Sequence, residues 1–234
     1  MITPKDRIIV ALDFPSQDEA RAMAARLKGR VGVFKIGMEL VYSGGLDLAR
    51  ELIDEGEQVF LDLKLLDIGH TVMRATSAVA RLGAAFLTVH GVDEKTMNAA
   101  VEGRGDSLLK LLGVTVMTNL DQADLNQQGI NDLSPSELAI RRASMASQCG
   151  FDGVITSGHE AAKIREAIGG DRLIITPGIR PAGADVGDQT RVMTPAKALQ
   201  AGADYLVIGR PITQAEDPLA AVETIVDQIS EISA

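Results

Sequence analysis

Three charged residues, Asp62, Lys64 and Asp67, come soon after an apolar run, residues 59–61, that has the composition of a buried strand. Side chains alternate between the two faces of a strand, so Asp62 and Lys64 are expected to point the same way, with Asp67 in the turn beyond. A fixed ammonium among carboxylates can stabilise a developing negative charge where water is excluded. A surface salt-bridge cluster is the alternative, and it would contribute little stability. Because the strand that precedes these charges is expected to be buried, a catalytic role is favoured over a surface cluster.

The rest of the chain alternates between apolar runs and helical patterns, without a linker. We expect strands at 7–13, 33–37, 59–67, 86–90, 111–117, 153–157, 173–176 and 205–208. Helices are expected at 17–28, 46–55, 71–82, 94–101, 135–149, 160–168 and 195–201, with a last one opened by Asp217 and Pro218. Eight such units in one domain, 1–234, predict an α/β fold, a single (β/α)8 TIM barrel. An open doubly wound sheet is the alternative, but it seldom has eight regular units.

Composition excludes several classes of function. The net charge is −9 and aromatic residues make up only 3% of the chain, with no Trp, so neither a phosphate backbone nor stacked bases are expected partners. The single cysteine, Cys149, allows no disulfide within the chain, which suits a reducing compartment. No signal peptide and no run of membrane-spanning length is expected. These features predict a soluble cytoplasmic protein without nucleic-acid or membrane partners.

In a barrel the active site lies at the carboxyl ends of the strands, so the residues there are the candidates for binding and catalysis. Besides the opening cluster they are Asp13, Lys35, His90, Thr118, Ser157, Pro177, Arg180, Gly209 and Arg210. His90 fits a hydrogen-bonded structural residue as well as a catalyst. No His, Cys and carboxylate spacing indicates a metal site, and neither a dinucleotide fingerprint nor a P-loop is present. We therefore expect no metal and no cofactor.

Two segments near the end of the chain predict a phosphate site. Residues 178–193 form a long connection with Arg180 and Gln189, and its glycines suit a lid that closes over a ligand. Gly209 and Arg210 offer a backbone N–H and a guanidinium after the last strand, where barrels commonly bind phosphate.

Six segments together resemble the orotidine 5′-phosphate decarboxylase family. They are Ala11-Leu12-Asp13, Phe34-Lys35-Ile36-Gly37, Asp62-Leu63-Lys64-Leu65-Leu66-Asp67-Ile68, Thr176-Pro177-Gly178-Ile179-Arg180-Pro181, Gly187-Asp188-Gln189 and Val207-Ile208-Gly209-Arg210-Pro211-Ile212. The D-x-K-x-x-D element is shared with related phosphosugar enzymes, whereas the combination is specific. The resemblance implies cofactor-free decarboxylation of orotidine 5′-phosphate to UMP, the last step of pyrimidine synthesis.

The resemblance also implies roles for individual residues. Lys64 would donate the proton to C6, while Asp62 would crowd the substrate carboxylate and hold Lys64. The ribose contacts would be Asp13 and Lys35. The implied pyrimidine-reading and neighbouring ligand contacts are Ser157, Thr118 and Pro177, and the implied phosphate grip and lid are Arg180, Gln189, Gly209 and Arg210.

Asp67, Ile68 and Thr71 resemble residues that reach into a neighbouring subunit's site, which implies a homodimer with shared active sites. Here the chain departs from the family pattern, because Leu66 replaces a His and Gly69-His70 replaces Pro-Asn. Losing the Pro leaves the chain before Thr71 freer.

Two other functions remain open. The first is a phosphosugar barrel that shares the D-x-K-x-x-D element but uses a metal, such as a 3-keto-gulonate 6-phosphate decarboxylase or a hexulose-phosphate synthase. The two lysines and the Gly-Asp-Gln segment disfavour it. The second is a catalytically silent barrel that only binds a phosphate ligand.

Overall fold

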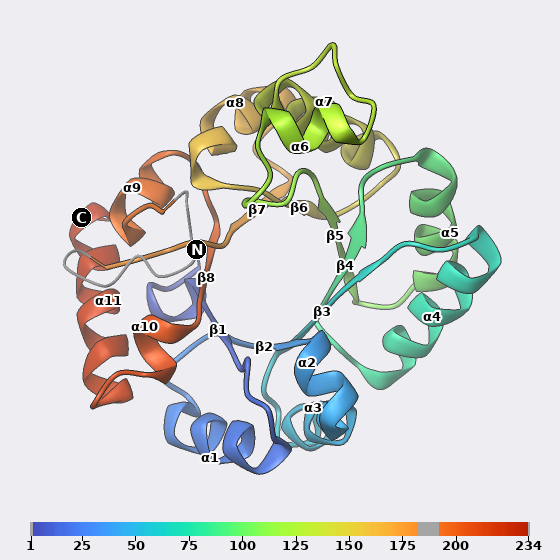
Figure 1. Cartoon of the computed structure of the whole chain (residues 1–234). Helices are drawn as coiled ribbons and strands as arrows, with labels where there is room; N and C mark the ends of the chain where they lie inside the picture. Colours follow the sequence, from blue (N-terminus) through green and yellow to red (C-terminus); the bar gives the residue numbers. More distant parts are fainter. Residues whose placement is uncertain (1, 182–191, 234) are drawn as a thin grey trace.

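A computed structural model describes residues 2–181 and 192–233. Its eight parallel strands close into one barrel in sequence order, with β1 paired to β8 (Figure 1). The strands are β1 (Ile8–Ala11), β2 (Val33–Gly37), β3 (Val59–Leu65), β4 (Phe86–His90), β5 (Lys110–Val114), β6 (Gly153–Ile155), β7 (Leu173–Thr176) and β8 (Tyr205–Ile208). The predicted TIM barrel is confirmed.

The barrel interior is built in layers because every second side chain of a strand points inward. One apolar layer fills the interior with Ile9, Val33, Phe60, Phe86, Leu112, Ile175 and Tyr205. Two residues further along the strands, the next inward layer contains polar as well as apolar residues: Ala11, Lys35, Asp62, Thr88, Val114, Pro177 and Val207. The apolar layer is thus the floor of the barrel interior, and the polar residues Lys35, Asp62 and Thr88 lie directly above it.

The main helices form a ring outside the strands (Figure 1). They are α1 (Gln17–Leu27), α3 (Leu46–Asp54), α4 (Gly69–Leu82), α5 (Glu94–Arg104), α7 (Pro135–Gln148), α8 (Gly158–Ile168), α9 (Pro195–Gln200) and α11 (Pro218–Ser233). Side-chain caps begin several of them: Ser16 accepts from Glu19 N, and Ser134 forms a reciprocal capping box with Glu137. These helices cover the large core cluster on the outer face of the strands.

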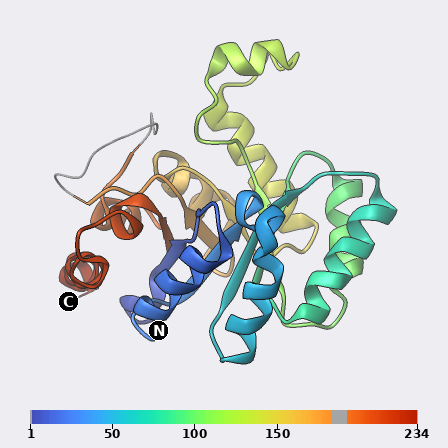
Figure 2. The ribbon, with the colours of Figure 1, turned by 60° about the horizontal axis from the view of Figure 1, so that its bottom comes forward.

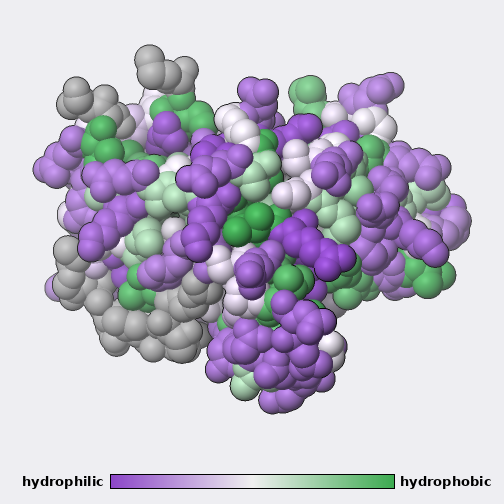
Figure 3. All heavy atoms as spheres, turned by 90° about the horizontal axis from the view of Figure 1, so that it is seen from above, coloured by the Kyte–Doolittle hydropathy of each residue, from purple (hydrophilic) through white to green (hydrophobic). Residues whose placement is uncertain are grey.

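Short elements occupy connections that the sequence left without structure. They are η1 (Lys5–Arg7), α2 (Met38–Leu40), η2 (Val41–Gly45), α6 (Gln122–Gln127) and α10 (Arg210–Thr213). Figure 2 shows the segment with α6 projecting away from the barrel. The side of the molecule shown in Figure 3 is covered mainly by hydrophilic side chains, with hydrophobic ones scattered among them.

Four expected strands are shorter in the structure. β1 ends at Ala11 instead of residue 13, β3 at Leu65 instead of residue 67, β5 at Val114 instead of residue 117, and β6 at Ile155 instead of residue 157. In each case the apolar or β-branched run continues past the last residue that has a strand partner. Asp13 and Thr118 therefore lie in loops beyond the strand ends, and Ser157 is the N-cap residue of α8.

At the amino ends of the strands, two aspartates connect neighbouring strands and helices. Asp152, just before β6, accepts hydrogen bonds from Leu111 N (2.9 Å) and Arg104 (2.8 Å). Asp204, just before β8, accepts from Ile174 N (2.8 Å) and Arg165 (2.6 Å). Each carboxylate thus satisfies a backbone donor of the preceding strand. No described helix is long and apolar enough to cross a membrane.

Candidate active site

A cavity with two lobes opens at the carboxyl ends of the strands. The outer lobe, of about 580 Å³, is lined by Ala11, Asp13, Phe14, Pro15, Glu19, Lys35, Asp62, Pro177, Gly178, Arg180, Val207, Gly209, Arg210, Thr213 and Gln214. The inner lobe, of about 210 Å³, is lined by Lys35, Phe60, Asp62, Lys64, Val114, Val116, Met117, Thr118, Asn119, Ile155, Pro177 and Val207. Lys35, Asp62, Pro177 and Val207 belong to both lobes, so the two form one site with a common wall. These volumes suit a small-molecule ligand.

Four charged side chains form an alternating row in this cavity, with Lys35 and Asp62 in both lobes, Asp13 in the outer lobe and Lys64 in the inner one. Lys35 Nζ lies 2.9 Å from Asp13 Oδ1 and 3.7 Å from Asp62 Oδ2. Lys64 Nζ lies 2.8 Å from both carboxylate oxygens of Asp62. Lys35 is buried, and the side chains of Asp62 and Lys64 are 15% and 29% exposed. Asp13, Lys35, Asp62 and Lys64 therefore form one row of alternating charges.

The charges in this row determine the protonation state of Asp62. Burial alone would raise the pKa of the Asp62 carboxyl, but the charges of Lys35 and Lys64 and the hydrogen bonds from Lys64 and Thr88 outweigh burial. The net result is an Asp62 pKa below its ordinary value. Asp62 is therefore an anion near neutral pH, and it faces two ammonium groups.

The backbone at Lys64 departs from a regular strand. Lys64 has φ 49°, in the left-handed region, and it is the one non-glycine residue with positive φ among residues 2–181 and 192–233. The register between β3 and β4 also shifts between Leu61 and Leu65. Unusual backbone conformations of this kind concentrate at functional sites.

The outer lobe gathers most of the residues predicted to grip a phosphate. Gly209 precedes the four-residue helix α10, and Arg210 begins that helix. Arg180 is buried and donates to its neighbour's carbonyl, Ile179 O, at 2.9 Å. Hydrogen bonds between Arg180 N and Met193 O (2.9 Å) and between Met193 N and Gly178 O (3.2 Å) join the two ends of the long connection. Gln189 lies outside the described residues.

Three predicted residues, Asp67, Ile68 and Thr71, are absent from the lining of both lobes in the part of the chain that the structure describes. All three are exposed, and Asp67 Oδ1 accepts from Ile68 N at 2.6 Å. They lie at the turn before α4 and in its first turn, so a single chain leaves them facing solvent.

Ser157 is also absent from the described lining of both lobes. It is buried, and its hydroxyl accepts from His159 N at 3.3 Å as the cap of α8. Thr118, by contrast, lies in the wall of the inner lobe as expected. The prediction that Ser157 reads a pyrimidine stays a prediction.

Two residues that support the charged row were not predicted from the sequence. Thr88 on β4 is fully buried, and its hydroxyl donates to Asp62 Oδ1 at 2.9 Å. Its position two residues after the floor residue Phe86 was the signal that could have identified it. Gly37 leaves room for the outer ion pair, because a Cβ there would lie 3.1 Å from Lys35 Nζ and 3.2 Å from Asp13 Oδ1.

His90 ends β4 and is partly buried beside the row. Burial lowers the pKa of the imidazole, the charges of Arg142 and Lys64 lower it further, and Asp62 partly opposes them. His90 is therefore neutral near neutral pH.

Burial and the charge of Glu94 raise the pKa of the Cys149 thiol, which is partly buried against the core as expected of a small apolar residue.

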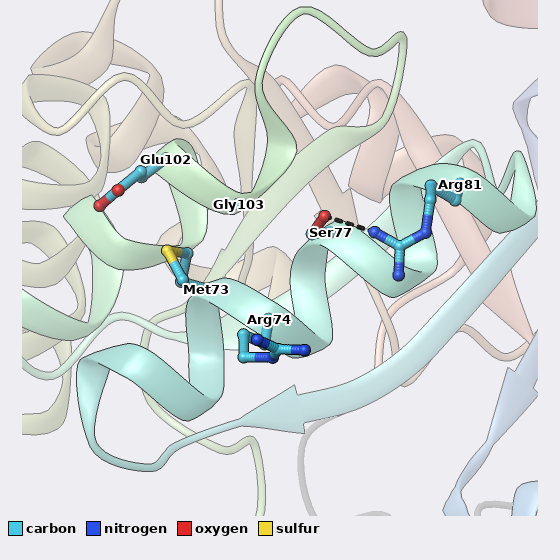
Figure 4. A pocket seen from close by; sticks show the side chains of 6 residues that line it. All are labelled: Met73, Arg74, Ser77, Arg81, Glu102 and Gly103. Carbon is cyan, nitrogen blue, oxygen red and sulfur yellow. Dashed lines mark hydrogen bonds between the residues drawn. The ribbon is translucent and has the colours of Figure 1, made fainter.

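A separate cavity of about 350 Å³ lies on the outer surface between α4 and α5 (Figure 4). Met73, Arg74, Ser77, Arg81, Glu102 and Gly103 line it, and Arg81 donates to Ser77 Oγ at 2.8 Å. Its charged side chains are exposed, and it shares no lining residue with the two lobes. Within the described ranges no group of three or more His, Cys, Asp or Glu residues is arranged to hold a metal ion.

Comparison with known proteins identifies the family. Residues 6–225 match the family model described as Orotidine 5′-phosphate decarboxylase / HUMPS family. The chain belongs to this family. It is 55% identical to the orotidine 5′-phosphate decarboxylase of Bradyrhizobium sp. (strain BTAi1 / ATCC BAA-1182), over 98% of this chain and 93% of that protein. It is 53% identical to the orotidine 5′-phosphate decarboxylase of Rhodopseudomonas palustris (strain BisA53), over 97% of this chain and 96% of that protein.

A solved structure gives the same result for the fold. The crystal structure of orotidine 5′-phosphate decarboxylase from Lactobacillus acidophilus superposes with a TM-score of 0.83 at 38% identity, covering 95% of this chain and 98% of that one. The resemblance stated from the sequence segments is confirmed, and so is the barrel.

Proposed function

We propose that this chain decarboxylates orotidine 5′-phosphate to UMP without a cofactor, through the row Asp13–Lys35–Asp62–Lys64. The decarboxylase class itself follows from family membership and from relatives of that name over almost the whole chain. The observation that carries the proposed mechanism is that the row runs through the cavity, with Lys35 and Asp62 lining both lobes and Lys64 lining the inner one.

The proposed binding mode places the phosphate in the outer lobe and the pyrimidine in the inner one. Gly209, Arg210 and Arg180 line the outer lobe, where guanidinium groups favour a phosphate dianion. The inner lobe is mainly apolar, with Thr118 and Asn119 as neutral polar groups that can hydrogen-bond a pyrimidine. Asp13 and Lys35 lie between these positions and are the proposed ribose contacts. Gln189 is retained as a proposed phosphate contact from the sequence alone.

In the proposed reaction the substrate carboxylate lies next to Asp62 and Lys64. Repulsion from the Asp62 anion disfavours the bound carboxylate, and this repulsion disappears as CO₂ forms. The bond between C6 and the carboxyl carbon breaks, and its electron pair remains on C6. The Lys64 ammonium stabilises this charge and donates a proton to C6. Lys64 is then reprotonated from solvent.

The proposed active unit is a homodimer. Beside the cavity mouth, Leu66 and Ile68 expose 55% and 73% of their surface, and such apolar side chains favour contact with a second copy. Asp67 and Thr71 lie in the same exposed stretch, from which they could reach a partner's site. A cytoplasmic location remains a prediction.

The test is to follow the absorbance of orotidine 5′-phosphate over time with wild-type enzyme, with and without EDTA. We expect turnover that EDTA does not change, whereas the metal-dependent phosphosugar alternative predicts loss with EDTA. Lys64→Ala should reduce the rate below a tenth of wild type, with Lys28→Ala, an exposed lysine paired with Glu55, as the matched control. Binding without turnover by the wild type would favour the silent barrel.

Arg210→Ala tests the proposed orientation. A charge-assisted hydrogen bond contributes about 1.5–3 kcal/mol, so UMP should bind roughly 10- to 150-fold more weakly. Binding of uridine, which lacks the phosphate, should be nearly unchanged in calorimetry. Equal losses for both ligands would mean that Arg210 has a structural role.

A further inference from the structure

The hydroxyl of Thr88 connects two catalytic groups from inside the barrel wall. Thr88 Oγ1 donates to Asp62 Oδ1 at 2.9 Å and accepts from the backbone N–H of Lys64, also at 2.9 Å. Thr88 is 0% exposed, and it is absent from the described lining of both lobes. It therefore acts on a ligand only through the residues it holds.

These two hydrogen bonds lie where β3 is irregular. The pairing of β3 with β4 shifts register between Leu61 and Leu65, and within this interval the Lys64 N–H finds its acceptor in a side chain of β4. The left-handed φ of Lys64 belongs to the same irregularity. A conformation that costs energy persists only where neighbouring groups hold it in place.

We propose that Thr88 is a positioning residue, whose hydroxyl holds the β3 irregularity and fixes the Lys64 ammonium against the Asp62 carboxylate. This inference rests on the proposed function and assigns a determinant of rate to a residue that does not touch the substrate. The Thr88 hydroxyl donates its single proton to Asp62, and its oxygen accepts from the Lys64 N–H. One group therefore orients both residues.

Packing alone does not require a hydroxyl at this position. Thr88 is fully buried, and a valine has nearly the same shape and would fill the same space on the strand. Thr76, on α4, supplies a matched comparison. It is also 0% exposed, and its hydroxyl has no hydrogen-bond partner among the described residues.

The experiment compares Thr88→Val, Thr88→Ala and Thr88→Ser with Thr76→Val in the full-length enzyme. Loss of precise placement can reduce a rate by about 10²-fold, so we expect kcat of both hydroxyl-free Thr88 variants to fall by that order. KM for orotidine 5′-phosphate should stay near wild type, because the phosphate grip is in the outer lobe. Thr88→Ser should restore most of kcat, and Thr76→Val should match wild type.

The pH profile separates positioning from a general loss of structure. The hydrogen bond from Thr88 is one of the interactions that lower the Asp62 pKa. In Thr88→Val the acid limb of kcat against pH should therefore move to higher pH, and in Thr88→Ser it should stay in place.

Three results would overturn the inference while the wild type remains an active decarboxylase. They are an unchanged kcat in the hydroxyl-free variants, a loss expressed wholly in KM, and failure of both hydroxyl-free variants to fold while Thr76→Val folds. An inactive wild type would instead count against the proposed function.

Discussion

At Lys64 the chain accepts a strained backbone in order to present an ammonium. Left-handed φ is unfavourable for residues with a Cβ, by about 1–2 kcal/mol. The folded barrel nevertheless keeps Lys64 at φ 49° and within 2.8 Å of Asp62. We infer that this position is retained for chemistry, at a cost in stability.

Replacing Lys64 should reveal this strain. Glycine normally destabilises a strand relative to alanine, but it has no penalty at positive φ. We therefore expect Lys64→Gly to be more stable than Lys64→Ala by about 0.5–1 kcal/mol, since the relief of strain exceeds the entropy cost of glycine. The free energy of unfolding in urea measures this difference, and both variants should be inactive. A less stable glycine variant would show that the conformation is unstrained.

His90 makes a prediction about pH. Its pKa is lowered in the folded protein, mainly by burial, whereas the unfolded chain binds a proton near pH 6.5. As pH falls below about 6.5, the unfolded state takes up this proton first, so the folded state loses stability until the folded pKa is passed. In His90→Gln this part of the decline should be missing. The check is the free energy of unfolding from pH 8 to pH 5, and parallel curves for the two proteins would refute the assignment.

At the scale of elements, the two ends of the strands have separate tasks. The carboxyl ends carry the charged row, while the amino ends are joined by Asp152 and Asp204 through backbone donors of β5 and β7. Each aspartate also binds an arginine, Arg104 or Arg165, from a helix outside the barrel. This arrangement stabilises the barrel at the end that is remote from the site.

Asp204→Ala should therefore change stability and leave catalysis intact. It removes the acceptor of Ile174 N and one of several acceptors of Arg165, and an unsatisfied buried donor costs about 1–3 kcal/mol. Urea unfolding should show a loss of that size, while kcat stays at the wild-type value. Asp171→Ala, at an exposed position in the loop before β7, is the control and should hardly change the free energy of unfolding. A fall in kcat at full occupancy would contradict the separation of the two ends.

The sequence predicted most elements because their patterns were strong. Four strands, Val33–Gly37, Phe86–His90, Leu173–Thr176 and Tyr205–Ile208, have the expected bounds. Other ends differ because a strand ends where its pairing ends, and pairing is not visible in composition. The end of β5 at Val114 is an example, since the apolar run continues to Met117. Short helices such as α6 were missed, although Asp121 and Asp124 form a capping box there.

For the site, the charged row was predictable and its support was not. Alternation along a strand placed Asp62 and Lys64 together, and the structure has them in contact. The same rule assumes regular geometry, however, and therefore could not reveal the left-handed Lys64 or the need for Thr88. Ser157 was read as a strand end because a β-branched run precedes it, whereas its hydroxyl caps a helix.

At the scale of the whole molecule, the proposed dimer places residues of one chain in the site of the other. Lys64 lines the inner lobe of its own chain, whereas Asp67 is exposed and absent from the described lining. In the proposed dimer, Lys64 should therefore serve the active site of its own chain and Asp67 the active site of the partner chain.

Co-refolding equal amounts of Lys64→Ala and Asp67→Ala chains tests this geometry. In a mixed dimer one site carries both lesions and the other carries neither. Random mixing makes about half of the dimers mixed, so roughly a quarter of all sites should be active in a two-fold arrangement. Decarboxylase activity no higher than the mean of the separate preparations would show that Asp67 does not cross the interface.

The closed ring of strands has a consequence for the order in which the β–α units follow one another along the chain. Because β1 pairs with β8, and α11 contacts α1 and α9, the hydrogen bonds of the barrel do not depend on which unit comes first. A circularly permuted chain, with its original ends joined by a flexible linker and new ends cut in the exposed loop at residues 105–108, would keep every strand pairing. That loop lies at the amino ends of the strands, so the rearranged chain should assemble the same charged row and the same cavity.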